Sequence, residues 1–512
     1  MHSKVRVRFA PSPTGPLHIG GVRTALYNYL FAHQHGGTFI LRIEDTDRSR
    51  FVPGAEEYIN EALLWLGILP EEGTVQGGEY GPYRQSERRD SYLQYALRLV
   101  EEGNAYYAFD TPEELEAMRK RLKDEDGTNP VYDAFSRKLM RNSITLPSAE
   151  VKTLIESGIP WVIRLKVPEA ETVTIHDLIR GEVSVDSTHI DDKVLIKSDG
   201  MPTYHLANVV DDYLMKISHV IRGEEWLPSA PHHVLLYRYL GWSEDMPRFA
   251  HLPLLLKPEG SGKLSKRDAE RGGFPIFPLE WIDPVSGNPA LGFREEGYLP
   301  EATLNFIAML GWNPGTEQEM FSLRELTEHF SLERIVKSGA KFDIEKAKWY
   351  NEQYIRRHSD DWLAEEMLKI KPENDISLDR AKARAIAGLM KERISFVKEI
   401  WTKADYFFRA PVRYDEGVIA KKLTPEAAAV LSGFSSSLKK APPNLSQSDF
   451  SEMLNAVLAE HSMPAGKIMQ VLRVAVTGSG AGPDLFPMLE VLGKDEVSSR
   501  IEQALQLIQP RS

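Results

Sequence analysis

The sequence of 512 residues predicts an α/β protein with a doubly wound parallel sheet, followed by an all-α region. Short apolar strands alternate with helical stretches and Gly/Pro-rich turns as far as about residue 270. Beyond about residue 301 helical periodicity dominates, and three long segments are predicted to be α-helical: 360–402, 424–440 and 447–510. A chain of this length folds as several domains rather than around a single core.

The first predicted element is a strand, which is followed by a sharp turn and a helix. Val5, Val7 and Phe9 alternate with arginines, as in a strand with two different faces. The segment 11–16 contains three prolines and a glycine, so it cannot continue the strand. A helix is then predicted by apolar residues at helical spacing: Val22, Ala25, Leu26 and Tyr29.

His18, Gly20 and Gly21 at the start of this helix form a candidate nucleotide site. A helix N-terminus favours anions, and two residues without Cβ atoms let adenine and ribose approach the backbone. His18 can donate a hydrogen bond to a phosphate oxygen as charge builds up in a transition state. A lone histidine is a weak signal, however, and the alternative is an ordinary strand–turn–helix with a surface histidine.

A basic motif at 263–267, Lys-Leu-Ser-Lys-Arg, is the second candidate for phosphate binding. Lys263 follows a glycine, which invites comparison with a P-loop. Lys257 stands where a P-loop needs its first glycine, and Leu264 stands where a Ser or Thr would hold Mg²⁺, so that motif is excluded. What remains is a glycine-containing loop that can close over a triphosphate and bring Lys263 and Lys266 to it. Alone, such a motif is more typical of a solvated basic turn.

Together the two motifs resemble those of class I aminoacyl-tRNA synthetases, and further stretches narrow the resemblance to the bacterial and organellar glutamyl-tRNA synthetases. The matching stretches are 8–15, 41–47, 81–88, 204–212, 221–226, 341–343 and 348–351. Gly21 replaces the second histidine of the class-wide pattern, as is usual in the glutamate branch. The resemblance implies ATP-dependent ligation of L-glutamate to tRNA(Glu) through a glutamyl-adenylate, with release of AMP and diphosphate.

Three charged residues fit the chemistry of that substrate. Glutamate carries one ammonium and two carboxylates, so its pocket needs an acid and cations, and arginine is preferred because its fork binds carboxylates bidentately. Arg8 closes the first predicted strand, Glu44 follows the apolar run 39–43, and Arg222 follows another apolar pair. Ligands of α/β sheets bind at these carboxyl ends. The alternative for the segment 44–47 is a Mg²⁺ site or a polar turn.

The resemblance also implies a role for each site residue. It implies an amino-acid pocket lined by Arg8, Ala10, Ser12, Glu44, Tyr204, Asn208 and Arg222. It implies an ATP site made of His18, Gly20, Gly21, Glu225, Lys263 and Lys266. Of these, His18, Lys263 and Lys266 are expected to be catalytic through stabilisation of phosphate charge, without a covalent nucleophile.

The resemblance further implies how the chain divides. Residues 1–108 and 195–270 are expected to be two halves of a Rossmann-type catalytic domain, and 109–194 an inserted domain that binds the acceptor end of tRNA. An insertion loop and a stem-contact region are expected at 271–350, and an α-helical anticodon-binding domain at 351–512.

Local patterns add elements to these expected domains. A helix is predicted to start near Thr111, with Asp110 or Thr111 as its N-cap. A β-like run follows at 160–167, and 194–196 is expected to resume the sheet of the catalytic domain. The segment 271–300 is rich in Gly, Pro and aromatic residues and predicts an irregular loop or a hairpin, with no assigned role.

The net charge of −12, from 62 basic and 74 acidic residues, argues against a polyanionic partner for the protein surface as a whole. Binding of tRNA therefore requires local basic patches, for which 119–123, 137–141 and 380–393 are candidates. Charge runs of this kind are more often solvated helix faces. Arg393, near Phe396 on a helix predicted from Arg380 to Trp401, is the candidate tRNA contact, because unpaired bases are read by stacking and arginine hydrogen bonds.

The absence of cysteine excludes disulfides and thiolate metal sites. Some members of the resembled family hold zinc after a segment like 105–107, but here 108–110 reads Ala-Phe-Asp, so no metal site and no zinc are expected. ATP as a substrate and Mg²⁺ are the expected cofactors. No signal peptide and no apolar run of transmembrane length are found, so we expect a cytoplasmic protein without a membrane partner. We also expect a monomer. The partners that the resemblance implies are tRNA(Glu), ATP and L-glutamate.

Three other functions remain to be weighed. A glutaminyl-tRNA synthetase has a β-rich region where this chain is predicted to be helical, and a tRNA-modifying glutamyl relative ends soon after the catalytic half. A non-catalytic RNA-binding protein with a degenerate synthetase fold would not need the complete set of His18, Glu44, Arg222, Lys263 and Lys266. The sequence does not decide whether glutamine tRNA is also charged.

Overall fold

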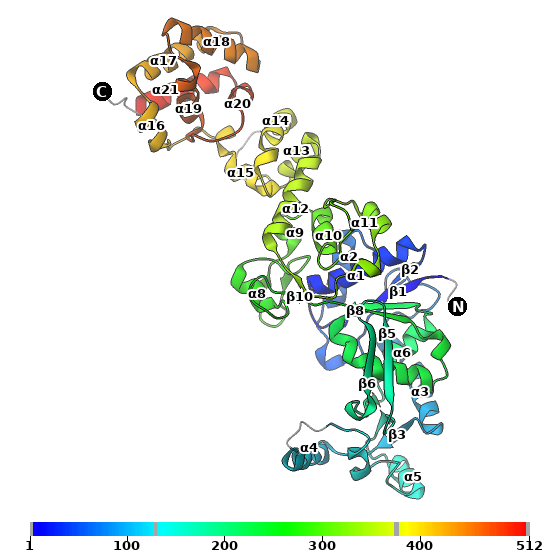
Figure 1. Ribbon diagram of the computed structural model, residues 1–512. Coiled ribbons are helices and arrows are strands. Elements are labelled where there is room, and N and C mark those ends of the chain that lie inside the picture. The colour runs from blue at the N-terminus through cyan, green and yellow to red at the C-terminus, as the bar shows by residue number, and fades with distance from the viewer. Residues whose placement is uncertain (1–3, 127–130, 373–377, 508–512) are drawn as a thin grey trace. The chain divides into compact units, whose positions relative to one another are not determined.

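The computed structural model describes residues 4–126, 131–372 and 378–507 (Figure 1). The chain divides into two compact units, Met1–Ala347 and Lys348–Ser512. The first unit is α/β and the second is helical, which confirms the predicted fold class. The finer division into five domains stays a prediction.

A parallel sheet forms the centre of the first unit. Strand β1 (Arg6–Phe9) pairs in parallel with β2 (Thr38–Leu41), and β8 (His219–Gly223) pairs in parallel with β9 (Arg248–Leu252). The two pairs are joined where the Ser218 N–H donates to the Arg6 carbonyl (2.9 Å). Parallel strands need crossover helices, here α1 (Ile19–Gln34) between β1 and β2 and α7 (Ala230–Tyr239) between β8 and β9.

Helix α1 is buried on almost all sides. Val22, Ala25 and Leu26 are fully buried as predicted, whereas Tyr29 stays partly exposed. Arg23 on the same helix is also buried and donates to the Leu310 carbonyl (3.0 Å). The helix is therefore anchored by packing behind the turn at 11–18. The other helices of this region are α2 (Ala55–Leu66), α3 (Arg89–Glu101) and α6 (Tyr204–Leu214).

The segment predicted to be an insertion contributes β4 to a second sheet, and this sheet corrects one prediction. Strand β4 (Val162–Leu165) pairs antiparallel with both β3 (Ala105–Ala108) and β7 (Val194–Ile196). The expectation that 194–196 resumes the central sheet is therefore wrong. The strand that leaves the catalytic domain, β3, is already paired with β4, and the chain returns through the same small sheet.

A long hairpin of the insertion joins the central sheet instead. Strands β5 (Thr172–Asp177) and β6 (Gly181–Asp186) pair antiparallel, and β5 pairs in parallel with β9 at Asp177 and Phe249. Figure 1 shows this hairpin running from the central sheet toward β3. Two helices complete the insertion, α4 (Pro112–Asp126) and α5 (Ser148–Glu156). Of the two predicted caps of α4, the Thr111 hydroxyl accepts from the Glu114 N–H (3.2 Å), as in a capping box.

The segment after the basic motif contains a hairpin, one of the two predicted alternatives. Helix α8 (Lys266–Gly272) precedes β11 (Trp281–Ile282) and β12 (Pro289–Ala290), which pair antiparallel, and α9 (Phe293–Glu296) follows. The Ile19 N–H donates to the Ile276 carbonyl (2.9 Å). The segment therefore supports the first turn of α1, a role that the sequence did not suggest.

The remaining elements of the first unit are short. Strands β10 (Leu255–Leu256) and β13 (Ala340–Lys341) pair in parallel. Helices α10 (Pro300–Ala308) and α11 (Leu323–His329) pack against α1, and α12 (Ile344–Arg357) leads into the second unit.

The second unit is helical, as predicted. Its helices are α13 (Asp360–Lys369), α14 (Arg380–Met390), α15 (Ile400–Lys403), α16 (Glu416–Lys422), α17 (Pro425–Lys440), α18 (Gln447–Glu460), α19 (Ala465–Thr477), α20 (Leu485–Leu492) and α21 (Lys494–Leu507). The predicted continuous helix from Arg380 to Trp401 is wrong. The helix ends at Met390, and the chain becomes extended at Ile394. The reason is a buried tertiary hydrogen bond in which the side-chain N–H of Asn351 donates to the Ser395 carbonyl (2.7 Å).

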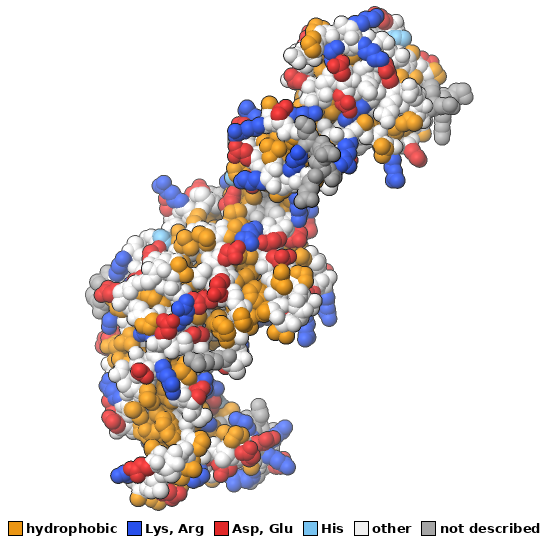
Figure 2. Space-filling view, turned by 180° about the vertical axis from the view of Figure 1, so that it is seen from behind, with side chains coloured by type: hydrophobic (Ala, Val, Ile, Leu, Met, Phe, Trp, Pro, Cys, Tyr) orange, Lys and Arg blue, Asp and Glu red, His pale blue; other side chains and the backbone are white. Residues whose placement is uncertain are grey.

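The predicted basic patches differ in character. Arg137 is only 3% exposed, and it pairs with Asp192 (3.1 Å) and donates to the Val167 carbonyl (2.9 Å), so it stabilises the insertion and offers nothing to RNA. In the patch at 380–393, Lys391 pairs with Asp360 (3.1 Å). Figure 2 shows basic and acidic side chains interspersed over the visible face. None of the helices that the structure describes is long and apolar enough to cross a membrane.

Candidate active site

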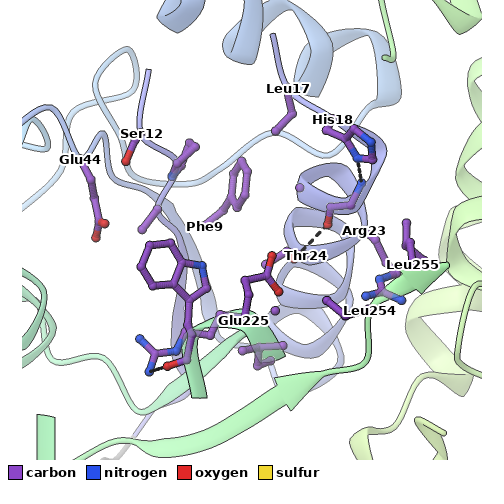
Figure 3. A pocket seen from close by; sticks show the side chains of 18 of the residues that line it. Phe9, Ser12, Leu17, His18, Arg23, Thr24, Glu44, Glu225, Leu254 and Leu255 are labelled. Carbon is purple, nitrogen blue, oxygen red and sulfur yellow. Dashed lines mark hydrogen bonds between the residues drawn. The ribbon is translucent and has the colours of Figure 1, made fainter. Parts of the chain in front are cut away.

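A cavity of about 360 Å³ opens where β1 and β8 end and α1 begins. It brings together most of the site residues that the sequence predicted. They are Arg8, Ala10, Ser12, His18, Gly20, Gly21, Glu44, Tyr204, Asn208, Arg222, Glu225 and Lys263. Lys266 is the predicted residue of this site that does not line it. In Figure 3, Ser12 and Glu44 lie at one side of the cavity, His18 and Arg23 lie at the other, and Glu225 lies between them.

His18 is the N-cap of α1, and its hydrogen bonds define its tautomer. The ring Nδ1 accepts from the Gly20 N–H (3.0 Å), so the ring proton must reside on Nε2. Nε2 is buried, and it has no partner within the described part of the chain. Burial, and then the positive charge of Lys263, lower the pKa of His18 to about 4. At neutral pH His18 is therefore an uncharged donor with an unused N–H.

The two glycines after His18 serve different purposes. A Cβ on Gly21 would lie 2.6 Å from Cδ1 of Leu17, so this glycine is required by packing within the turn. A Cβ on Gly20 would meet only Nδ1 of His18 at 3.4 Å and a Leu255 methyl at 3.9 Å. Both residues line the cavity, but in this structure the close approach at Gly21 is to a neighbouring side chain.

Lys263 and Lys266 are separated by the start of a helix. Lys263 forms an ion pair with Glu225 (3.0 Å) at the cavity. Burial raises the pKa of Glu225, but hydrogen bonds from its own backbone N–H and from Lys263 lower it overall. Lys266 is the first residue of α8, whose N-terminus is fixed by a capping box between Ser265 and Asp268. That cap positions Lys266 on the helix, with Glu270 at 3.9 Å, rather than at the cavity wall.

A buried network of three arginines and three carboxylates lies beneath the Glu44 side. Asp212 pairs with Arg8 (3.0 Å) and Arg42 (2.7 Å), and Arg42 also pairs with Glu44 (3.1 Å). Arg88 pairs with Asp211 (2.7 Å). Burial raises the pKa of Glu44, and this effect outweighs the positive charges of Arg42 and Arg8, which act to lower that pKa. Burial likewise acts to raise the pKa of Asp212, but there the same two arginines prevail and lower it.

Arg42, Asp211 and Asp212 belong to this network, although they were not predicted as site residues. The available signal was the pair of adjacent aspartates in the otherwise apolar segment 204–214. Buried acids need partners: Asp212 pairs with Arg8 on β1 and with Arg42 after β2, and Asp211 pairs with Arg88 just before α3. Six further polar or aromatic residues of the cavity wall were not predicted as site residues: Phe9, Thr14, Arg23, Thr24, Arg50 and Trp226.

Arg222 differs from the arginines of this network. It is 5% exposed and donates to the Tyr204 hydroxyl (2.6 Å), to Nε2 of His251 (3.0 Å) and to the Trp226 carbonyl (3.4 Å). Within the described residues no carboxylate forms an ion pair with it. Burial lowers the pKa of Arg222, yet a guanidinium stays protonated in proteins. The site thus contains a buried cation whose charge has no partner.

Asn208 adds an acceptor next to Glu44. Its side-chain N–H donates to Oε1 of Glu44 (3.0 Å), and its Oδ1 is buried without a partner in the described residues. Glu44 and Asn208 therefore present oxygen atoms on the same side of the cavity. An ammonium group can donate to both of them. Within the same ranges, no group of three or more His, Cys, Asp or Glu side chains is suited to a metal ion.

The buried histidines predict a pH dependence of stability. Unfolded histidine binds a proton near pH 6.5, whereas the pKa is about 4 for His18 and, mainly through burial, about 3 for His205. Between these values the unfolded chain holds more protons, so the free energy of unfolding should fall as pH falls from about 6.5 toward 4. We expect urea unfolding at several pH values to show that the free energy of unfolding falls less steeply with falling pH for His205→Asn than for the wild type. His176→Asn, at an 80% exposed side chain, is the control, and equal slopes for His205→Asn and the wild type would contradict the prediction.

Comparisons with known proteins extend over the whole chain. A family model described as the catalytic domain of class I tRNA synthetases (E and Q) matches residues 4–349, and one described as an anticodon binding domain matches 355–505. The chain is 57% identical over 504 residues to the glutamate–tRNA ligase of Cytophaga hutchinsonii, covering 98% of each chain. It is 55% identical to that of Amoebophilus asiaticus, covering 100% of this chain and 99% of the relative.

Solved structures agree with these relatives. A crystal structure of a glutamate tRNA ligase from Elizabethkingia meningosepticum, in complex with its amino acid, superposes with a TM-score of 0.95 at 49% identity. It covers 99% of this chain and 100% of that chain. A glutamate-tRNA synthetase from Elizabethkingia anophelis gives a TM-score of 0.93 at 49% identity, with 98% and 100% of the two chains covered.

Proposed function

The chain belongs to the glutamate–tRNA ligase family of class I tRNA synthetases, and we propose that its cavity holds glutamate at the Glu44 side and ATP at the His18 side. The chain catalyses the ATP-dependent ligation of L-glutamate to tRNA. The assignment of single residues to steps of this reaction is the proposal.

The unpartnered charge of Arg222 is the observation that carries the proposal. The three arginines and three carboxylates beneath the cavity neutralise one another, whereas Arg222 adds one uncompensated positive charge. Glutamate at neutral pH carries a net charge of −1. The net charge of glutamate would therefore compensate the charge of Arg222, which favours glutamate over glutamine, whose side chain is uncharged.

The other side chains of the cavity can be assigned to glutamate and to ATP, beginning with glutamate. We assign the ammonium group to Glu44 and to the free Oδ1 of Asn208, and the carboxylates to Arg222 and Arg8. Tyr204, which already accepts from Arg222, would close one wall of the pocket, together with Ala10 and Ser12 at the edge of β1.

For ATP, the unused Nε2–H of His18 would donate to a phosphate oxygen. Gly20, at the N-terminus of α1, would leave room for the nucleotide, and Gly21, which packs against Leu17, would line the same ATP site. Lys263 would exchange Glu225 for the triphosphate, and Lys266 would reach it when the loop closes. The carboxylates of the cavity already have partners, so Mg²⁺ would enter with the triphosphate, held chiefly by phosphate oxygens and water, and would neutralise their charge.

These placements support two successive transfers. An oxygen of the glutamate α-carboxylate forms a bond to the α-phosphorus of ATP, and the bond to the departing diphosphate breaks. A hydroxyl of the terminal ribose of tRNA then attacks the activated carbonyl and releases AMP. The side chains orient the reactants and stabilise phosphate charge, and none of them needs to form a covalent bond.

We further propose that the insertion at 109–194 binds the acceptor end of tRNA, that 271–350 contacts its stem, and that 351–512 binds the anticodon. The enzyme would act as a monomer in the cytoplasm, where its substrates occur together. Aminoacylation of purified tRNA isoacceptors with labelled glutamate tests the proposal. Charging of glutamate tRNA supports it, and charging of glutamine tRNA alone, with glutamine, would overturn the substrate assignment.

The purified protein should contain no stoichiometric zinc. The sequence has no cysteine, and Phe109 and Asp110 stand at the turn where some relatives bind the metal. Metal analysis of protein prepared without added chelator checks this expectation. About one zinc per chain, lost together with activity, would show that histidines and carboxylates hold the metal instead.

Arg393→Ala should weaken discrimination between anticodons without changing the affinity for ATP. Arg393 is exposed and lies at a 3-10 turn, Lys391–Arg393, where α14 gives way to an extended segment. Such a position can present a guanidinium to an unpaired base. Charging kinetics with tRNA transcripts bearing altered anticodons measure the effect. Arg413→Ala, which removes an exposed arginine of the helical unit outside the patch at 380–393, is the control. Identical discrimination in Arg393→Ala and the wild type would contradict the prediction.

A further inference from the structure

Two side chains behind Arg222 have no assigned role, although they determine how its guanidinium is held. Arg222 Nε donates to Nε2 of His251 (3.0 Å), and Nδ1 of His251 lies 2.6 Å from Oδ2 of Asp177. His251 and Asp177 are buried. Arginine can only donate, so Nε2 of His251 must accept and its ring proton must lie on Nδ1, facing Asp177. The three groups thus select one tautomer of His251.

The carboxylate of Asp177 is itself anchored. Its Oδ1 accepts from the backbone N–H groups of Ile179 (2.9 Å) and Arg180 (2.7 Å), and its Oδ2 accepts from the backbone N–H of His251 (3.1 Å). Burial acts to raise the pKa of Asp177, but the hydrogen bonds from His251 and from this turn lower it overall. Asp177 is therefore an ionised acceptor in a fixed position.

This anchor belongs to the inserted segment, not to the catalytic halves of the chain. Asp177 is the last residue of β5, and its neighbour Arg180 donates to the His251 carbonyl (3.2 Å) and pairs with Glu224 (2.5 Å). The turn of the long hairpin therefore contacts both the residue behind Arg222 and the residue that precedes Glu225. The hairpin does not line the cavity, but it supports the wall of the proposed amino-acid pocket from behind, through His251 and Glu224.

The contacts of Arg222 leave a defined part of its guanidinium available. Nε donates to His251, one N–H of Nη1 donates to Tyr204, and one N–H of Nη2 donates to the Trp226 carbonyl. Five N–H groups are present, so one remains on each terminal nitrogen. A carboxylate can accept these two side by side, provided that the guanidinium plane is held at the right angle.

We propose that His251 is a positioning residue that, oriented by Asp177, fixes the guanidinium plane of Arg222 for the carboxylate of glutamate. The inference rests on the proposed role of Arg222. It assigns to the hairpin of the insertion a part in amino-acid recognition, in addition to the contact with tRNA that is proposed for the insertion.

Three substitutions separate the two contacts of His251. In His251→Asn the amide can still donate to Asp177 but is too short to reach Arg222. In His251→Gln the amide oxygen can take the place of Nε2 and accept from Arg222. In Asp177→Asn the new amide N–H favours the opposite tautomer, in which the ring N–H points at Arg222 and can no longer accept from it.

We expect His251→Asn and Asp177→Asn to raise the KM for glutamate about tenfold or more, the usual size of a lost hydrogen bond to a charged group. The KM for ATP should stay unchanged, and His251→Gln should recover most of the loss. ATP–pyrophosphate exchange with tRNA present gives both constants, and thermal unfolding checks that the variants are folded. His176→Asn, at the preceding residue on the exposed side of β5, is the matched control and should behave as the wild type.

Equal KM values for glutamate in His251→Asn and the wild type would overturn the inference, as would equal increases for glutamate and ATP. Arg222→Gln separates this failure from that of the proposed function. If Arg222→Gln raises the KM for glutamate and His251→Asn does not, only the positioning role is lost. If neither variant changes it, the assignment of Arg222 fails first. In the double variant, the effect of His251→Asn should disappear.

Discussion

Arg222→Gln should lower kcat/KM for glutamate by roughly two to four orders of magnitude. Arg222 is buried, and in the proposed complex it pairs with a carboxylate shielded from water. Removal of one partner of such a pair typically costs about 3–5 kcal/mol, since the other charge stays buried without compensation. The glutamine side chain at position 222 would be uncharged and could not replace the guanidinium. The KM for ATP should change little, because His18, the proposed phosphate contact, lies across the cavity from Glu44.

Steady-state aminoacylation with varied glutamate and then varied ATP measures this effect. Arg238→Gln is a matched control, since it removes an arginine that pairs with Glu171 on the surface, where ion pairs contribute little. Near-normal kcat/KM for glutamate in Arg222→Gln would contradict the assignment of the pocket.

Arg8→Gln should also reduce activity with glutamate, but through a different balance of effects. Arg8 shares Asp212 with Arg42, so its loss leaves that carboxylate with one arginine instead of two. We therefore expect lower thermal stability together with lower activity. Arg222→Gln should mainly affect glutamate, because Arg222 has no carboxylate partner among the described residues whose charge would be stranded. Thermal unfolding of both variants distinguishes the two cases.

Lys266→Ala should slow the formation of the adenylate by about a hundredfold or more while leaving the KM for glutamate unchanged. Lys266 does not line the cavity, so it cannot contribute to ground-state binding there. If the loop closes over ATP, its ammonium meets the triphosphate as charge shifts to the leaving diphosphate. Loss of one such donor costs about 3 kcal/mol, by analogy with oxyanion holes, and the cost appears in kcat.

The contact of Lys266 with Glu270 is long, at 3.9 Å, and half exposed, so the variant should retain the stability of the wild type. Arg271→Ala removes another exposed cation of α8 and serves as the control. Lys263→Ala should differ from both by raising the KM for ATP, because Lys263 already lies at the cavity with Glu225. Unchanged kcat together with weaker glutamate binding in Lys266→Ala would contradict its assigned role.

The sequence by itself determined the features that depend on neighbouring residues. The alternation at 5–9, the prolines at 11–16 and the glycines at 20–21 predicted a strand, a turn and a helix, and the structure has all three. The helical second unit followed from periodicity in the same way. Motif residues that lie within a few positions of a strand end or a helix start also reached the cavity together, because those ends meet at one edge of the sheet.

Only the tertiary structure decided which distant groups become partners. Arg8 and Asp212 are 204 residues apart, and Asp177 and His251 are 74 apart, so no local pattern connects them. The pairing of β7 with β4, the end of α14 at Met390 and the burial of Arg137 were likewise decided by distant contacts. A buried charge or an open backbone carbonyl must find a partner wherever the fold supplies one, and these partners come from other segments of the chain. For that reason most of the predicted residues that line the cavity could be found from motifs, whereas the residues that hold them in place could not.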